Sequence, residues 1–145
     1  MKKKKKSHLK ESYRSKFEAR IATSLKSRGI KFKYEEKAYP LHKPLNGFCC
    51  NCGSNDVARN SVYNPDWFIY IRSRLAFIVE TKGRLTPENR KTLLTFKRTY
   101  PDVDIRMVFM RDNTLTKTSK TRYSEWAEKN GFPWAIGDIP DEWII

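Results

Sequence analysis

The chain has 145 residues, a length typical of one domain, and its hydrophobic fraction of 39% is sufficient for a buried core. Thirty Lys and Arg residues against sixteen Asp and Glu residues give a net charge of +14, which favours a polyanionic partner such as nucleic acid. No apolar run exceeds five residues, the length of the run at positions 75–79, whereas a membrane span needs roughly 20. The lysine-rich start has no apolar signal segment. We therefore expect neither membrane insertion nor secretion.

Positive charge is concentrated at one end of the chain. Residues 1–33 contain thirteen Lys and Arg residues and only two acids, Glu11 and Glu18. The five consecutive lysines at positions 2–6 repel one another, so we predict a disordered basic arm over residues 1–10, either simply solvated or in contact with phosphate. Residues 123–145 are acidic instead. This end is expected to face away from DNA or to pack on the basic part.

The first predicted element is an amphipathic helix over residues 13–28. Ser12 is its expected N-cap, and Gly29 stands where a helix-ending glycine belongs. Glu18 falls at the edge of the apolar stripe, where its carboxylate can face a cleft. Apolar residues recur at every fourth position, namely Tyr13, Phe17, Ile21 and Leu25.

The middle of the chain predicts strands separated by a long connection. Residues 30–35 alternate between apolar and charged side chains, which indicates a half-buried strand that ends near Pro40. Residues 40–60 are rich in Pro, Gly, Asn and Ser and predict a long connection or ribbon. Two apolar runs follow, at residues 62–71 and 75–81, and the polar residues between them indicate an antiparallel hairpin.

The last third predicts two more helices around a strand. Thr86 as N-cap and Pro87 as the first helical residue indicate a helix to about residue 99, which Pro101 ends. Residues 105–110 predict a strand covered on both faces, residues 123–127 a short helix, and residues 139–143 a final turn. The fold class is therefore α/β, a mixed sheet flanked by helices, in one domain over residues 11–145 with a bridge or ribbon at about 40–60.

Three charged residues of the predicted hairpin are candidates for a catalytic site. Glu80 and Lys82 are two positions apart and project from the same face of their strand. Asp66 follows Pro65, and hairpin pairing places residues 64–68 opposite residues 78–82. Two neighbouring carboxylates in an apolar hairpin are costly unless a divalent cation neutralises them. Oxygen ligands favour Mg²⁺ or Mn²⁺, and such an ion would polarise a phosphate and activate a water for attack. Lys82 would orient that water, hold the pKa of the water down, or balance the charge on the phosphate.

Each candidate also has a structural interpretation. Glu80 and Lys82 alone would form a surface ion pair on an edge strand, and Asp66 would merely end a turn. Glu18 with Arg14 would be a helical charge pair. The pattern Glu-x-Lys is common by chance, but here it ends the strand that follows Pro-Asp and is itself followed by Gly83. That combination favours a nuclease.

The motifs Arg-Ser-Lys-Phe-Glu at 14–18, Asn-Pro-Asp-Trp-Phe at 64–68 and Ile-Val-Glu-Thr-Lys-Gly at 78–83 together resemble the PD-(D/E)XK nucleases. More closely, they resemble the phage endonuclease I family, which resolves Holliday junctions. The likeness continues at residues 26–32, 34–36, 101–106 and 139–144, and covers most of residues 13–144.

The resemblance implies a restriction-endonuclease-like fold and a metal-dependent endonuclease with one or two Mg²⁺ or Mn²⁺ ions per site. By the same resemblance, Asp66, Glu80 and the Thr81 carbonyl would bind metal, Glu18 would help hold a second ion, and Lys82 would be the catalytic lysine. It further implies a domain-swapped homodimer, with the 40–60 segment as the bridge, in which Glu18 of one chain completes the site of the other. The expected substrate is a four-way junction cut by paired nicks, in the cytoplasm of a host or infected bacterial cell.

Two features depart from the family pattern. The hairpin is longer than the resemblance leads us to expect, and its tip, residues 72–74, either contacts phosphate or stays solvated. The bridge contains a cysteine cluster that we do not associate with these resolvases. Its thiols are either free in a reducing cytoplasm or ligands of a structural Zn²⁺ with His42 or a second subunit. The cysteines are Cys49, Cys50 and Cys52.

The substrate is the least determined part of the prediction. A sequence-specific nicking or homing-type endonuclease on the same fold, and a non-catalytic DNA-binding protein with a zinc-stabilised ribbon, are the alternatives. The four tryptophans are expected in the core or in dimer contacts rather than as base-stacking platforms. Basic residues near the motifs are candidates for contact with branched or duplex DNA: Arg14, Lys16, Arg84, Arg90 and Lys91.

Overall fold

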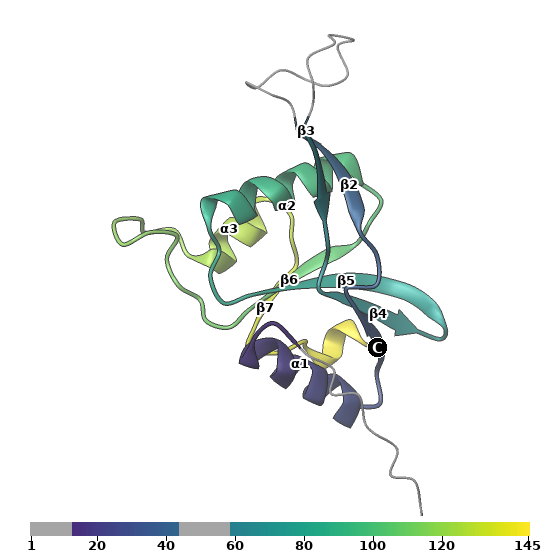
Figure 1. The fold of residues 1–145 in the computed structure, drawn as a ribbon. Coiled ribbons are helices and arrows are strands. Elements are labelled where there is room, and N and C mark those ends of the chain that lie inside the picture. The colour runs from purple at the N-terminus through teal and green to yellow at the C-terminus, as the bar shows by residue number, and fades with distance from the viewer. Residues whose placement is uncertain (1–12, 44–58) are drawn as a thin grey trace, which may run out of the picture.

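The computed structural model describes residues 13–43 and 59–145 (Figure 1). Within this part, five strands form a mixed sheet and two others form a separate ribbon. The elements in chain order are α1 (Lys16–Ser27), β1 (Lys31–Tyr34), β2 (Tyr39–Lys43), β3 (Arg59–Tyr63), β4 (Trp67–Ile71), β5 (Arg74–Lys82), α2 (Pro87–Thr99), β6 (Ile105–Phe109), α3 (Tyr123–Lys129), β7 (Trp134–Ile136) and the 3₁₀ turn η3 (Asp141–Trp143).

The main sheet has the strand order β1-β4-β5-β6-β7. Its first three strands are antiparallel, while β5, β6 and β7 run parallel. The antiparallel β2 and β3 form the ribbon, which projects past α2 (Figure 1). The predicted mixed α/β sheet with flanking helices is confirmed, and β5 lies at its centre.

Helices cover both faces of this sheet. Alternate residues of a strand point to opposite faces, so Trp67 and Ile69 pack with the apolar side of α1, whereas Phe68 packs with α2, α3 and the ribbon. In Figure 1, α1 and η3 lie on one side of the sheet, and α2 and α3 lie on the other. The strand β6 is covered on both faces, as predicted, because Met107 and Val108 are both fully buried.

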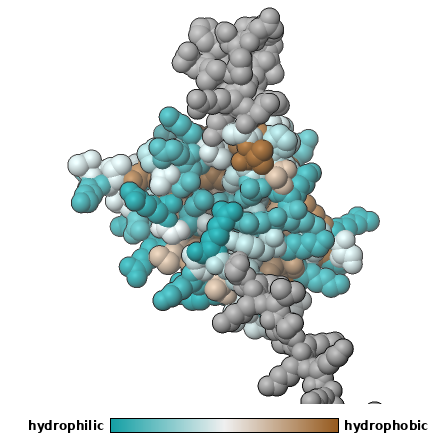
Figure 2. Space-filling view, viewed as in Figure 1, coloured by the Kyte–Doolittle hydropathy of each residue, from teal (hydrophilic) through white to brown (hydrophobic). Residues whose placement is uncertain are grey.

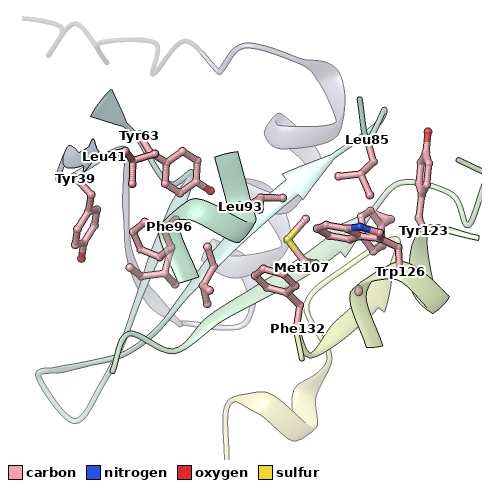
Figure 3. Packing of buried hydrophobic residues seen from close by; sticks show 14 of the residues in the cluster. Tyr39, Leu41, Tyr63, Leu85, Leu93, Phe96, Met107, Tyr123, Trp126 and Phe132 are labelled. Carbon is pink, nitrogen blue, oxygen red and sulfur yellow. The ribbon is translucent and has the colours of Figure 1, made fainter. Parts of the chain in front are cut away.

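The core between the sheet and α2 is aromatic. Phe96 of α2 is fully buried and contacts the rings of Tyr39 and Tyr63, with ring centroids 5.0 and 5.1 Å apart. Figure 3 shows Tyr63 and Leu41 of the ribbon beside Phe96. The ribbon is therefore fastened to the domain through α2, and its end at Tyr63 has a fixed position relative to the sheet.

The helix α1 begins later than its sequence predicts. Ser15, not Ser12, is the N-cap, since its backbone is extended and its side chain accepts a hydrogen bond from the amide of Glu18 at 3.1 Å. The predicted end is confirmed, because Gly29 has the left-handed φ of +67° that favours glycine. Two serines three positions apart both suit an N-cap, and the periodicity of the helix alone does not select between them.

Two predicted strand boundaries are wrong. The strand after α1 ends at Tyr34 rather than near Pro40, because Glu35 turns the chain with a φ of +48°, and Pro40 lies inside β2. The apolar run at 62–71 is not one strand: β3 ends at Tyr63 and β4 begins at Trp67 in a different sheet. Pro65 lies between them, and its missing N–H cannot contribute to a ladder.

The acidic end of the chain packs on the basic first helix. Arg28, which caps α1, pairs with Asp138 at 3.3 Å and with Asp141 at 2.8 Å. Of the two expectations for the acidic end, packing on the basic part is therefore confirmed. The three-residue β7 was not predicted. Its Trp134 is 37% exposed, whereas Trp67 and Trp126 lie in the core as expected.

Hydrophilic residues cover most of the face that Figure 2 views, with isolated hydrophobic residues between them. Among the described residues, no helix is both long and apolar enough to cross a membrane.

Candidate active site

The hairpin register brings the two central carboxylates together. Trp67 pairs with Val79, so the preceding Asp66 lies beside Glu80 at the end of β5. Asp66 is 4% exposed and Glu80 is 2% exposed. Because β5 is the central strand and Glu80 is buried, the interpretation of Glu80 and Lys82 as a surface ion pair on an edge strand is wrong.

Glu80 is held by three donors from three different segments. The Tyr63 hydroxyl donates to its Oε2 at 2.5 Å, and the backbone amide of Asp66 donates to the same oxygen at 3.3 Å. Lys82 Nζ lies 2.8 Å from Oε1. Hydrogen bonds to a charged carboxylate are shorter and stronger than neutral ones, so the orientation of Glu80 is fixed by the ribbon as well as by its own strand.

Asp66 is oriented by Thr81. The backbone amide and the hydroxyl of Thr81 both donate to Asp66 Oδ2, at 2.9 and 2.8 Å. Trp67 Nε1 donates to the Thr81 hydroxyl at 3.2 Å, which fixes that hydroxyl in turn. Both hydrogen bonds that the described residues give to the Asp66 carboxylate end on Oδ2. Its other oxygen, Oδ1, is therefore the one available to a ligand.

The electrostatics of the site favour a bound cation. Burial, and then the charge of Glu80, raise the pKa of Asp66 to about 8, although the Thr81 hydrogen bonds and Lys82 oppose this. Burial lowers the pKa of Lys82, but the charge and hydrogen bond of Glu80, with Asp66 and Glu18, outweigh it and leave that pKa raised. Burial and Glu80 likewise raise the pKa of Tyr63 well above its usual value. Lys82 is thus an ammonium near neutral pH, and its single positive charge faces the two carboxyl groups of Asp66 and Glu80, of which Asp66 retains its proton up to about pH 8 in the metal-free protein.

A cleft of about 230 Å³ opens onto these side chains. Asp66, Glu80 and Lys82 lie on one wall, and the first turns of α2 supply Asn89 and Thr92 on another. Asn89 Oδ1 accepts the Thr86 amide in a capping box that fixes the start of α2. The cleft is small, polar and placed where β4 begins and β5 ends.

Glu18 is near this cluster but does not join it. It is buried at 7% exposure on α1, and its Oε2 accepts a hydrogen bond from the Tyr34 hydroxyl at 3.2 Å. Arg14 pairs with Glu35 at 2.5 Å, so the predicted alternative of a helical Arg14–Glu18 pair is not what the structure has. Among the described residues, no three Asp, Glu, His or Cys side chains converge closely enough to hold one metal ion. The structure gathers Asp66 and Glu80, with Glu18 in the neighbouring layer.

The other predicted residues lie at different distances from the cleft. Arg14 lines it, Lys16 is exposed in the first turn of α1, and Arg84 is exposed just after β5. Arg90 and Lys91 lie on α2, the first half-buried and the second exposed. The predicted zinc ligands are not placed: Cys49, Cys50 and Cys52 lie outside the described residues, and His42 is known only as a backbone position in β2.

Sequence reasoning missed two contributors, Tyr63 and Asn89. Tyr63 precedes the Asn-Pro-Asp motif, but it reaches Glu80 from the ribbon, a separate sheet, which no local pattern reveals. Asn89 was identifiable as the third helical residue after Thr86, a position that favours capping partners. Its place on the cleft wall depends on how α2 packs.

The fold and the site define an α/β protein whose buried carboxylates and neighbouring lysine suit phosphodiester chemistry. The whole chain, residues 1–145, matches the family model described as phage endonuclease I. Endonuclease I of Escherichia phage T7 is 37% identical over 134 residues, which cover 92% of this chain and 78% of that protein. Endodeoxyribonuclease 1 of Enterobacteria phage T3 is 32% identical over 130 residues, covering 89% of this chain and 74% of the relative. The chain therefore belongs to the phage endonuclease I family.

Proposed function

We propose that the chain is a metal-dependent endodeoxyribonuclease that acts as a homodimer and introduces paired nicks into four-way junctions. The observation that carries the chemistry is the burial of Asp66 and Glu80 side by side with Lys82. Family membership and the names of the two relatives, an endonuclease and an endodeoxyribonuclease, support DNA as the substrate. The net charge of +14 agrees with a polyanionic substrate.

The residues present fit a small divalent cation. Two neighbouring buried carboxyl groups, of which Asp66 has its pKa raised by burial and by the charge of Glu80, are a site for positive charge, and their oxygen atoms match the preference of Mg²⁺ and Mn²⁺. Asp66, Glu80 and the carbonyl of Thr81 would hold the ion. Such an ion supplies charge stabilisation at the phosphate and a more acidic water. Glu18, which is buried in the neighbouring layer and accepts a hydrogen bond from Tyr34, would help hold a second ion, supplied either by its own chain or by a partner chain.

The chain's own residues orient the substrate around this site. Thr81 keeps Asp66 Oδ2 engaged, which leaves Oδ1 to bind a ligand in the cleft that Asp66 lines. Lys82, held as an ammonium, can transfer its hydrogen bond from Glu80 to a phosphate oxygen when DNA enters, and can donate a proton to the departing oxygen. Because its pKa is raised, we assign Lys82 to charge stabilisation and proton donation rather than to a general base.

A domain-swapped homodimer is consistent with how α1 and β1 pack. Both lie before the ribbon in the chain, and both pack on the part that follows it: β1 pairs with β4, and α1 packs on Trp67 and Val79. Domain swapping replaces such contacts by identical ones between copies. A swap through the ribbon would therefore keep the local environment of Glu18 and supply it from the other chain. Two sites in one particle would account for paired nicks.

The experiment is to incubate the protein with a synthetic four-way junction, with and without Mg²⁺, and to map the cuts. We expect paired, Mg²⁺-dependent cuts in the junction and far slower cleavage of a linear duplex with the same arm sequences. Cleavage of the duplex at one fixed sequence would instead favour the nicking or homing-type alternative.

The non-catalytic alternative is tested with the carboxylates. Asp66→Ala and Glu80→Ala should each abolish cleavage while junction binding persists, because neither residue is a cation that contacts phosphate. An exposed carboxylate far from the cleft, Glu128 on α3, offers a matched control as Glu128→Ala. Unchanged cleavage in either site variant would refute the assignment of these carboxylates.

A further inference from the structure

The tip of the β4–β5 hairpin has an unusual backbone for its sequence. Ile71 pairs with Arg74, so Arg72 and Ser73 form a two-residue turn. Their φ angles are +51° and +64°. This left-handed turn is the one that Asn-Gly adopts with little strain, whereas arginine and serine adopt it at a cost. A strained tip that carries charge is a candidate contact site.

The tip and the neighbouring edge strand form a basic surface, which we call the basic edge: Lys31, Lys33, Arg72 and Arg74. Arg72 and Arg74 are exposed, and neither forms an ion pair with any described residue. Lys31 of β1 lies opposite Tyr70, and Lys33 lies opposite Phe68. Lys33 pairs with Glu36 at 2.8 Å. Three of the four cations therefore face no acid in the described part of the chain.

A groove runs along the same edge. It has a volume of about 940 Å³, and its lining includes Lys31, Lys33, Tyr34, Tyr70 and Ser73. The strand β1 ends the sheet on this side. Pairing with β1 of a second copy would place lysines against lysines, which is unfavourable. The charge of the groove fits a polyanion instead, and phosphate esters are the polyanion to which Arg and Lys side chains bind in a salt-dependent manner.

We propose that the basic edge binds the phosphate backbone of a DNA duplex arm at a distance from the cut, an inference that rests on the proposed function. The tip and the cleft lie at opposite ends of β5, whose residues from Arg74 to Glu80 span about 20 Å at roughly 3.3 Å per residue. In Figure 1 the tip projects to one side, away from the start of α2. About 20 Å equals about six nucleotides of one strand at 3.4 Å each. The basic edge thus contacts phosphates about six nucleotides from the scissile bond.

The test measures DNA binding without divalent metal, by fluorescence anisotropy in EDTA over a range of salt concentrations. Two junctions are compared, one with arms of about 12 base pairs and one with arms of about four, which end before the basic edge. The variant carries Arg72→Asn, Ser73→Gly and Arg74→Gln, so the turn receives the residues that its backbone favours and the hairpin stays folded. Lys129→Gln on α3 is the control, because it removes a positive charge at a distance from this edge.

With long arms, the triple variant should bind about tenfold more weakly. The slope of its log affinity against log salt should fall by about two, close to one for each phosphate that it no longer neutralises. With short arms it should bind like the wild type, and Lys129→Gln should match the wild type on both. Unchanged binding to long arms, or equal weakening on short arms, would overturn the inference while leaving the proposed function intact. If the triple variant binds long arms more weakly but the wild type makes no Mg²⁺-dependent cuts, the role of the basic edge would be upheld and the proposed nuclease function would be refuted.

Discussion

The substitution Asp66→Asn should stabilise the metal-free protein at alkaline pH. Folding raises the pKa of Asp66 from 3.8 to about 8, chiefly through burial and then through Glu80. Between these values the folded state retains a proton that the unfolded state releases. The free energy of unfolding therefore falls as pH rises from about 4 to about 8. Asparagine has the same shape, can accept the Thr81 hydrogen bonds through its oxygen, and carries no charge.

The magnitude follows from the shift. A difference of roughly 4 pH units corresponds to about 6 kcal/mol at 1.36 kcal/mol per unit. This value is the upper limit for the free-energy cost of ionising Asp66 in a site that does not relax. Entry of water and movement of side chains reduce that cost. We expect Asp66→Asn to exceed the wild type by about 2–3 kcal/mol at pH 9 and by nearly nothing at pH 4.

Urea unfolding in EDTA at several pH values measures this difference. Trp67 is fully buried and donates a hydrogen bond to Thr81, so its fluorescence reports on this part of the fold. Asp102→Asn, at an exposed position, is the matched control and should stay within about 0.5 kcal/mol of the wild type. A variant that is less stable than the wild type at pH 9, or a gap that does not change with pH, would refute the reasoning.

Four further outcomes are expected. Mg²⁺ should raise the melting temperature more at pH 8 than at pH 6, because the ion displaces the proton of Asp66. The same increase in the Asp66→Asn variant as in the wild type would contradict this. Tyr63→Phe should lower the free energy of unfolding by about 1–2 kcal/mol in urea titrations, through loss of the hydroxyl that donates to Glu80, and no loss would show that this hydroxyl is replaceable. Phe96→Ala, at a fully buried ring, should cost about 3–5 kcal/mol by the same titration, and a cost below this range would place the core elsewhere. Ser73→Gly should raise the melting temperature, with a gain of about 1 kcal/mol from relief of the left-handed φ; a lower melting temperature would count against that turn.

Where a feature depends on neighbours in the chain, the sequence was enough to predict it. Hydrophobic periodicity and capping residues predicted three helices, and the N-cap of α2 was identified as Thr86. The sequence also indicated that residues 64–68 lie opposite residues 78–82, but the turn alone does not give the exact register. Counted from the pair Ile71 and Arg74, an unbroken ladder would place Asp66 opposite Val79, and the register shift between Ile69 and Tyr70 places it beside Glu80 instead. The candidate carboxylates and lysine were thus identified by local rules of strand geometry.

Other features were decided only by the packing of layers. The apolar run at 62–71 concealed a passage from the ribbon to the main sheet, and that passage is what brings Tyr63 to Glu80. Glu18 was predicted to face a cleft, yet its partner is Tyr34 of β1. The physical reason is that the periodicity of a helix or strand determines on which face a side chain lies, whereas the side chain that it contacts belongs to another element. That meeting depends on how side chains fill the space between sheets and helices, which no single segment encodes.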